Sequence, residues 1–145
     1  MPTDNSLIFI TDRTSADVQT AIANKSSPVP QKGALNFQDL NRIDNNIFIV
    51  INLLKPLGEH FYFDLKYNWV ETDRLKFVDA NRIRNNVYVM NNSFYNSSIQ
   101  PISQSNRLNF QEVNLWETYI SECNQSINKI ENSYRYCGEL ICGEW

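Results

Sequence analysis

One twelve-residue sequence occurs three times in this chain and restricts what it can fold into. It reads LNFQDLNRIDNN at 35–46, named here repeat 1, and LKFVDANRIRNN at 75–86, repeat 2. A looser copy, LNFQEVNLWETY at 108–119, is repeat 3. Because the copies share one pattern of apolar, amide and acidic residues, we expect all three to form the same local structure.

Repeat 1 has the features of a helix N-terminus. Asn36 stands at the N-cap position, where its side chain can accept a backbone N–H of the first turn. Asp39, three residues later, faces the positive end of the helix dipole, and Leu35 and Leu40 can pair as a hydrophobic staple. The other repeats follow this plan, although Lys76 is a poor cap in repeat 2. The residues assigned to the helix-start motif are Asn36, Asp39, Asn41, Asp79, Asn81, Asn109, Glu112 and Asn114.

Apolar residues continue from each repeat at a helical spacing. From Phe37 to Leu54 they recur at intervals of 3, 3, 4, 3 and 4 residues, and the other two copies keep this register. Such spacing places them on one face of a helix and does not fit a strand. We therefore predict amphipathic helices over 36–54, 76–95 and 109–131, each of which needs the others to bury its apolar stripe.

The segments around the repeats have signals of their own. Thr14 as N-cap and Asp17 at N3 predict a short helix within 11–24, and LIFI at 7–10 reads as a strand or as a lead-in that packs on the bundle. The stretch at 59–72 is rich in aromatic residues and predicts a short strand or an ordered loop. The closing residues 132–145 break the helical rhythm and indicate a small β-hairpin or an extended arm.

The sequence thus predicts a mainly α fold in one domain, 1–145. It comprises an N-terminal segment with a short helix at 7–33, a three-helix core at 34–131, and a C-terminal hairpin or arm at 132–145.

No catalytic or cofactor-binding pattern accompanies this architecture. The chain lacks a phosphate-binding loop, a GxSxG and an HExxH sequence, and its cysteines, Cys123, Cys137 and Cys142, form no CxxC pair and stand apart from the single histidine, His60. A net charge of −3 argues against a nucleic-acid partner, and the apolar run at 47–54 is too short to cross a membrane. We expect a protein that is not an enzyme, binds no metal or cofactor, and is made in a reducing cytoplasm because no signal peptide precedes it.

Two groups of residues remain as interaction candidates. Asn41, Asn81 and Asn114 occupy equivalent repeat positions, and we interpret them as side chains that cap or bridge neighbouring helix starts rather than as a ring of ligands. The candidate partner contacts are Phe61, Tyr67, Trp69, Tyr136, Leu140 and Trp145. The aromatic residues at 61–69 more often cover the edge of a core than bind a sugar or base, and the closing segment can either fold back on the bundle or pair with another chain.

The order of several motifs resembles a known module. ITDRTSADVQTAI, GALNFQDLNRIDNNI, a Trp-bearing KYNWVETD, RLNFQEVNLWETYI and a closing RYCGELICGEW follow one another along nearly the whole chain. This order is similar to a small helical module recurrent in structural proteins of phages and prophages of Firmicutes, in tail, baseplate and fibre-associated proteins. The chain departs from it in a longer aromatic linker, a shorter connector at 26–33, and Cys137 and Cys142 in place of small residues.

The resemblance implies a non-enzymatic virion protein of a phage or phage-tail-like particle, a docking and building block of the tail, baseplate or fibre attachment. Its partners would be other virion structural proteins and further copies of itself. The alternatives are a receptor- or glycan-binding module that uses 59–72, a capsid-associated decoration protein, and a cytoplasmic helical adaptor.

Overall fold

The computed structural model describes residues 7–27, 29–57, 62–93 and 107–141, and for residues 131 and 134–141 it describes the backbone alone. Within these ranges the chain is helical and contains no strand. The elements are α1 (Ser15–Ala23), α2 (Phe37–Leu54), the 3-10 turn η1 (Lys55–Leu57), α3 (Phe77–Ser93) and α4 (Phe110–Ile141).

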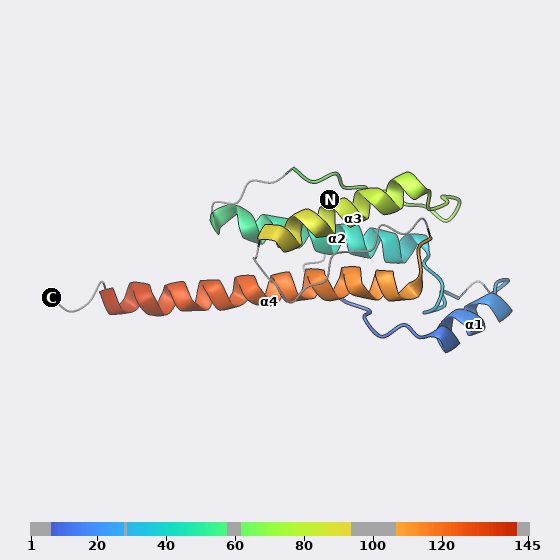
Figure 1. Ribbon diagram of the computed structural model, residues 1–145, viewed down its shortest axis with the longest axis horizontal. Helices are drawn as coiled ribbons and strands as arrows, with labels where there is room; N and C mark the ends of the chain where they lie inside the picture. The colour runs from blue at the N-terminus through green and yellow to red at the C-terminus, as the bar shows by residue number, and fades with distance from the viewer. Residues whose placement is uncertain (1–6, 28, 58–61, 94–106, 142–145) are drawn as a thin grey trace.

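The long helices α2, α3 and α4 lie side by side and run in the same direction (Figure 1). A parallel bundle requires the chain to travel back between consecutive helices, and residues 62–70 do so in an irregular extended conformation (Figure 1). Helix α1 lies at the end where the three helices begin, while α4 extends well past the other two at the opposite end (Figure 1).

Local hydrogen bonds explain where the helices begin. The Asn36 side chain accepts the backbone N–H groups of Gln38 and Asp39 at 2.8 and 3.1 Å, and the Asp39 carboxylate accepts the Asn36 N–H at 3.3 Å. The structure thus has Asn36 at the N-cap, as predicted, with Asp39 completing a capping box, and Thr14 with Asp17 forms another at α1. In repeat 2 only the carboxylate half is seen, from Lys76 N–H to Asp79 at 3.2 Å.

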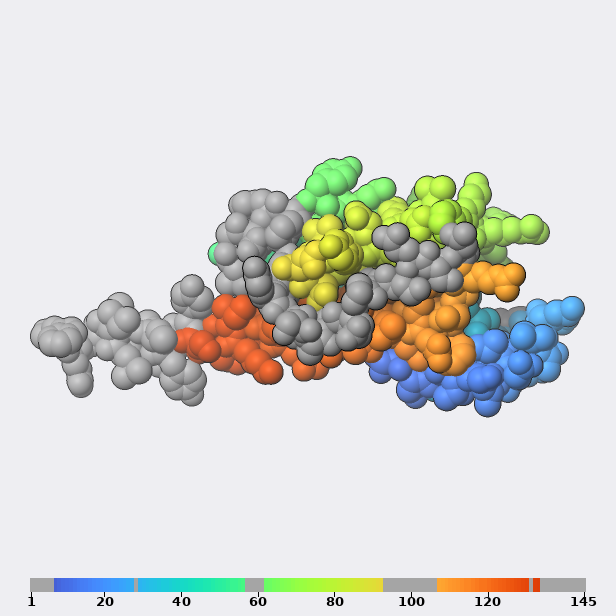
Figure 2. All heavy atoms as spheres, in the orientation of Figure 1, coloured from blue at the N-terminus to red at the C-terminus, as the bar shows by residue number. Residues whose placement is uncertain are grey.

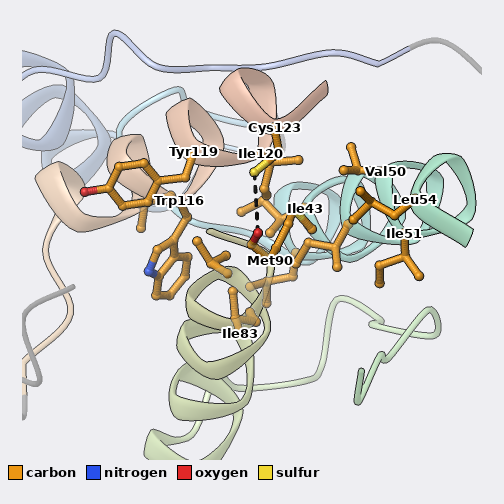
Figure 3. Packing of buried hydrophobic residues seen from close by; sticks show 14 of the residues in the cluster. Ile43, Val50, Ile51, Leu54, Ile83, Met90, Trp116, Tyr119, Ile120 and Cys123 are labelled. Atoms are coloured by element: carbon orange, nitrogen blue, oxygen red, sulfur yellow. Dashed lines mark hydrogen bonds between the residues drawn. The ribbon is translucent and has the colours of Figure 1, made fainter. Parts of the chain in front are cut away.

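Equivalent positions of the three repeats fill one hydrophobic core. Ile43, Ile83 and Trp116 share a repeat position and are all 0% exposed. Three further sets of equivalent residues are at most 4% exposed and belong to the same cluster, and Figure 3 labels the last of them; these sets are Leu40, Ala80 and Val113; Ile47, Val87 and Ile120; and Val50, Met90 and Cys123. The three copies therefore act as three equivalent sides of one parallel bundle.

The segment at 7–10 is a lead-in and not a strand, and Phe9 in it packs against the core. The described part of the aromatic stretch, from residue 62 onward, forms an ordered irregular segment and not a strand.

The C-terminal hairpin or arm is not confirmed. Helix α4 continues through Ile141, ten residues beyond the predicted end of the third helix at 131, and residues 142–145 lie outside the described part. The reason is that 132–141 contains no proline, and its one glycine, Gly138, costs a helix only about 1 kcal/mol. Change in the apolar pattern alone does not end a helix.

Candidate functional site

The tenth residue of each repeat is charged and yet buried. Asp44 and Glu117 are 0% exposed, and Arg84 is 7% exposed. A charge removed from water is costly unless it is paired and hydrogen-bonded, so clusters of this kind are where binding or catalytic chemistry is first sought.

Each of these residues pairs with the next repeat. Asp44 accepts N–H bonds from Arg82 Nη1 and Nη2 at 2.7 and 2.8 Å. Arg84 forms a two-point pair with Glu112, through Nε and through Nη2, the latter 2.8 Å from Oε2. Repeat 1 is thereby joined to repeat 2, and repeat 2 to repeat 3.

Glu117 joins repeat 3 back to repeat 1, because it accepts a 2.7 Å hydrogen bond from Arg42. Arg13, from the segment before α1, also enters here and is only 4% exposed. Its guanidinium lies 2.9 Å from Glu117 Oε1 and 3.3 Å from Asp39 Oδ1. Figure 2 shows this N-terminal part of the chain lying against the start of α4. We name the whole set the charged ring: Arg13, Asp39, Arg42, Asp44, Arg82, Arg84, Glu112 and Glu117.

The charged ring is balanced, because it holds four guanidinium groups and four carboxylates. The hydrogen bond to Glu112 raises the pKa of Arg84. Burial acts to lower the pKa of Arg82, but the bonds to Asp44 and the nearby carboxylates outweigh it and the pKa is raised. Every carboxylate of the ring lies against a guanidinium, so none is free to act as a general base. The arrangement is suited to joining helices.

Asparagine side chains fix the extended segments to the helices. Asn41 donates to the Trp69 carbonyl at 2.9 Å and accepts the Trp69 N–H at 3.0 Å. Asn114 holds Arg13 in the same way, at 2.9 and 3.2 Å. Each amide thus pairs with both backbone groups of one residue, as a neighbouring β-strand would. These two asparagines act as bridges, but their partners are extended segments and not the neighbouring helix starts that the sequence suggested.

The third member of that set behaves differently. Asn81 accepts a bond from Arg84 Nη1 at 2.8 Å, within its own helix. Two further bridging residues were missed: Asn86 pairs with both backbone groups of Asp64, at 2.6 and 3.2 Å, and Asn46 donates to the Ile8 carbonyl at 2.8 Å. Their signal is the second asparagine of the Asn-Asn pair that ends repeats 1 and 2.

The candidate partner contacts differ in how exposed they are. Trp69 is 3% exposed, its indole N–H donates to Asp44 at 3.1 Å, and the Lys66 ammonium lies 3.6 Å from its ring centroid. It belongs to the core, as the core-edge interpretation of this segment expects, and is not available as a partner contact. Tyr67 is 44% exposed and meets Phe48 edge-on at 5.6 Å between ring centroids. Tyr62, which was not selected, is 89% exposed.

The remaining candidates are not tested. Phe61 and Trp145 lie outside the described residues, and Tyr136 and Leu140 are described by their backbone alone.

An apolar hollow of about 340 Å³ adjoins the charged ring. It is lined by residues in and just before α1, by the connector and first residue of repeat 1, and by the first half of repeat 3; they are Arg13, Val18, Gly33, Leu35, Leu108, Asn109, Phe110 and Val113. Gly33 packs so closely on the backbone of Asp17 and Val18 that a Cβ atom there would overlap it. Glycine at this position is therefore required for α1 to dock.

The surroundings of the Cys123 thiol and the spacing of His, Cys, Asp and Glu side chains bear on thiol and metal chemistry. Cys123 is buried, burial together with the charge of Glu122 raises its pKa to about 12, and its thiol faces the Met90 carbonyl at 4.0 Å (Figure 3). Among the described residues, no three His, Cys, Asp or Glu side chains are grouped as metal ligands would be. None of the described helices has both the length and the apolar character that a membrane span requires.

Comparison with protein-family models, with curated proteins and with solved structures finds no match for this chain.

Proposed function

We propose that this chain is a non-enzymatic structural protein of a phage or phage-tail-like particle, a building block of its tail, baseplate or fibre attachment. The motif order from ITDRT to the closing CGEW supports this, through its resemblance to the phage module. The observation that carries the proposal is how the buried polar groups are used: the charged ring and the asparagine bridges bind the chain to itself.

A second feature fits the same role. Helix α4 has 32 residues, against 18 in α2 and 17 in α3, and projects past them from a bundle whose other end is locked (Figure 1). A rigid body with one projecting helix has the form of a subunit that joins neighbours. The partners would be other virion structural proteins and copies of the chain itself.

The test is to locate the protein in particles purified from an induced culture, by immunogold electron microscopy and by mass spectrometry of the same fraction. We expect gold at the tail end or baseplate and a constant ratio of this protein to the major tail protein across a density gradient. A cytoplasmic protein of similar abundance, followed through the same gradient, controls for carry-over. Its presence in the soluble lysate alone, with none in particles, would favour the adaptor alternative; gold on the head would favour a decoration protein.

One observation supports receptor or glycan binding as a second candidate. Tyr62 and Tyr67 lie on one segment with 89% and 44% of their surfaces exposed, and exposed aromatic rings are common sugar-stacking surfaces. Replacing both by Ala should then abolish adsorption to cells while particles still assemble. Val70→Ala, at a residue 52% exposed on the same segment, is the matched control. Normal adsorption of the double variant would exclude this candidate.

A further inference from the structure

Two extended segments are held on the bundle in the same way, and the first of them is residues 8–13, named here the N-terminal strap. Asn46 of α2 donates to the Ile8 carbonyl at one end, and Asn114 of α4 pairs with both backbone groups of Arg13 at the other. These asparagines are the twelfth and the seventh residues of their repeats. The N-terminal strap therefore lies along the seam between α2 and α4, where a seam is the line along which two neighbouring helices meet.

Residues 64–69, named here the linker strap, follow the same rule at the seam between α2 and α3. Asn86, the twelfth residue of repeat 2, pairs with both backbone groups of Asp64. Asn41, the seventh residue of repeat 1, does the same with Trp69. The two anchored residues are five positions apart in both straps. The two straps are therefore equivalent elements of one repeated design.

The straps differ in how much of the core they supply. In the linker strap, Trp69 is 3% exposed and Leu65 packs against the same hydrophobic cluster, so removing this strap would leave a cavity. In the N-terminal strap, Arg13 is the one buried residue, Phe9 is partly buried at the edge of the core, and Ile8 is 56% exposed. Withdrawing the N-terminal strap therefore exposes little apolar surface.

The charged ring also remains paired when the N-terminal strap is withdrawn. Both carboxylates that Arg13 contacts have a second guanidinium beside them, because Arg42 lies 2.7 Å from Glu117 and 3.0 Å from Asp39. Loss of Arg13 therefore leaves neither carboxylate buried and alone, which is the costly case for an ion pair. The ring would then hold four carboxylates and three guanidiniums, so the vacated seam attracts a cation.

The position of each strap in the chain adds to this difference. The linker strap lies between α2 and α3, so a helix of the bundle holds it on either side. The N-terminal strap precedes all three long helices and is joined to α2 through α1 and the connector at 24–34. Of the nine residues of α1, Ala21 alone is buried. The N-terminal strap can therefore move without displacing a helix of the bundle.

We propose that the N-terminal strap is a detachable element, which leaves and re-enters the seam between α2 and α4 as one unit while the bundle stays folded, and that the vacated seam binds the same segment of a second copy of this chain. The seam fits that occupant because it holds this sequence here, and the Arg13 guanidinium of the second copy would restore the charge balance. The inference concerns the isolated protein, so it stands or fails independently of whether the protein is part of a particle.

Hydrogen exchange in the full chain measures detachment. The Ile10 and Arg13 amides, which donate to Glu117 and Asn114, should exchange about a hundredfold faster than the Trp69 amide of the linker strap. The reason is that local detachment exposes the first two, whereas the third requires opening of the core. Equal exchange rates at the three amides would overturn the proposal, because they would make both straps part of one cooperative unit.

Arg13→Ala tests whether the guanidinium holds the N-terminal strap in place. This variant should speed exchange at the Ile10 amide about tenfold and leave the Trp69 amide and the urea midpoint of the bundle unchanged. Arg74→Ala, at an exposed arginine, is the matched control and should change none of these quantities. A variant that fails to fold, or one in which Trp69 accelerates as much as Ile10, would show that the strap is integral to the bundle.

A synthetic peptide tests whether the seam binds a second copy of the segment. In the Arg13→Ala protein, an excess of the peptide LIFITDR, the sequence of residues 7–13, should shift the side-chain amide NMR signals of Asn46 and Asn114. The control peptide LIFITDQ lacks the guanidinium and should leave both signals in place. Absence of a shift with the first peptide, or equal shifts with the two, would overturn exchange between copies.

Discussion

The two ends of the bundle are built from different chemistry. Among the described residues, every buried charged or amide side chain lies within a repeat or is Arg13. The buried residues that follow the repeats along the helices are apolar apart from the Cys123 thiol; they are Ile47, Val50, Ile51, Leu54, Val87, Met90, Ile120, Cys123 and Ile127. Ion pairs and hydrogen bonds therefore join the helices at the end where they begin, and close packing of apolar side chains joins them at the far end (Figure 3).

This difference addresses a problem that repeated sequences create. Three helices with nearly the same apolar stripe could pack in another order or direction at little cost, because apolar contacts do not distinguish them. The tenth repeat position does, since it is Asp44 in one copy, Arg84 in the next and Glu117 in the third. Buried ion pairs contribute modestly to net stability, but a wrong neighbour would leave a charge unpaired. The apolar end supplies stability, and the charged ring selects one arrangement.

The largest effect should come from removing a shared carboxylate of the charged ring. Glu117→Leu leaves the guanidiniums of Arg13 and Arg42 without this partner and should lower the free energy of unfolding by about 3–5 kcal/mol. Urea unfolding followed by circular dichroism measures it. Glu71→Leu, at an exposed residue, is the control and should stay within about 0.5 kcal/mol of the wild type. A loss below 1 kcal/mol for Glu117→Leu would mean that the ring is loosely coupled.

A cavity at the apolar end should cost a similar or smaller amount. Leu54→Ala removes a side chain that is 2% exposed and should lower the free energy of unfolding by about 2–5 kcal/mol. Leu54→Met keeps most of the volume and should lose less than about 1.5 kcal/mol. Equal losses in both variants would indicate that shape, and not buried volume, governs this end.

Exchanging the two members of an ion pair tests whether the charged ring recognises specific partners. Arg84→Glu and Glu112→Arg should each destabilise the fold, whereas the double exchange should recover about 0.5–3 kcal/mol relative to the sum of the single changes. The double-mutant cycle in urea measures this coupling. Additive losses would show that Arg84 and Glu112 do not recognise each other.

The asparagine bridges should have a smaller, local effect. Asn41→Ala leaves the Trp69 backbone N–H and carbonyl without their partners and should cost about 1–3 kcal/mol. Hydrogen exchange at the Trp69 amide should accelerate more than exchange in α4. The exposed Asn128 offers a control, since its replacement by Ala should change neither quantity.

The smallest effect is expected at the surface, where Lys32 lies 2.9 Å from Asp12 and 3.7 Å from Asp17. The bond from Lys32 lowers the pKa of Asp12, and the bonds from Thr14 lower that of Asp17. A lowered folded-state pKa stabilises the fold above the ordinary value of 3.8, and this contribution is lost as the pH falls through the folded value. The hydrogen bond to Asp12, together with the charges of Asp12 and Asp17, raises the pKa of Lys32, whose contribution is present below 10.5 and is lost as the pH rises through the folded value.

Lys32→Gln should therefore speed hydrogen exchange in α1 slightly at pH 7, and the difference from the wild type should shrink as the pH falls below 3.8 and in high salt. A difference that is independent of pH would mean that the lysine acts through packing alone.

The sequence by itself determined the local structure. A cap residue, an acid three positions later and an apolar interval of three or four specify a helix through bonds within one turn, so the starts of α1, α2, α3 and α4 could all be predicted. The same reasoning misplaced the end of α4, because an aromatic, glycine-bearing segment such as 132–141 is compatible with a helix and with an arm, and local preferences do not separate them.

Only the tertiary structure decided how these helices are used. Whether Asp44 meets Arg82, whether Asn114 pairs with Arg13, and whether Trp69 is exposed or buried all depend on the parallel direction of α2, α3 and α4 and on the extended path at 62–70. Direction is fixed by contacts between residues tens of positions apart, which leave no periodic trace in the sequence. A buried ion pair is visible only when both of its partners have been placed.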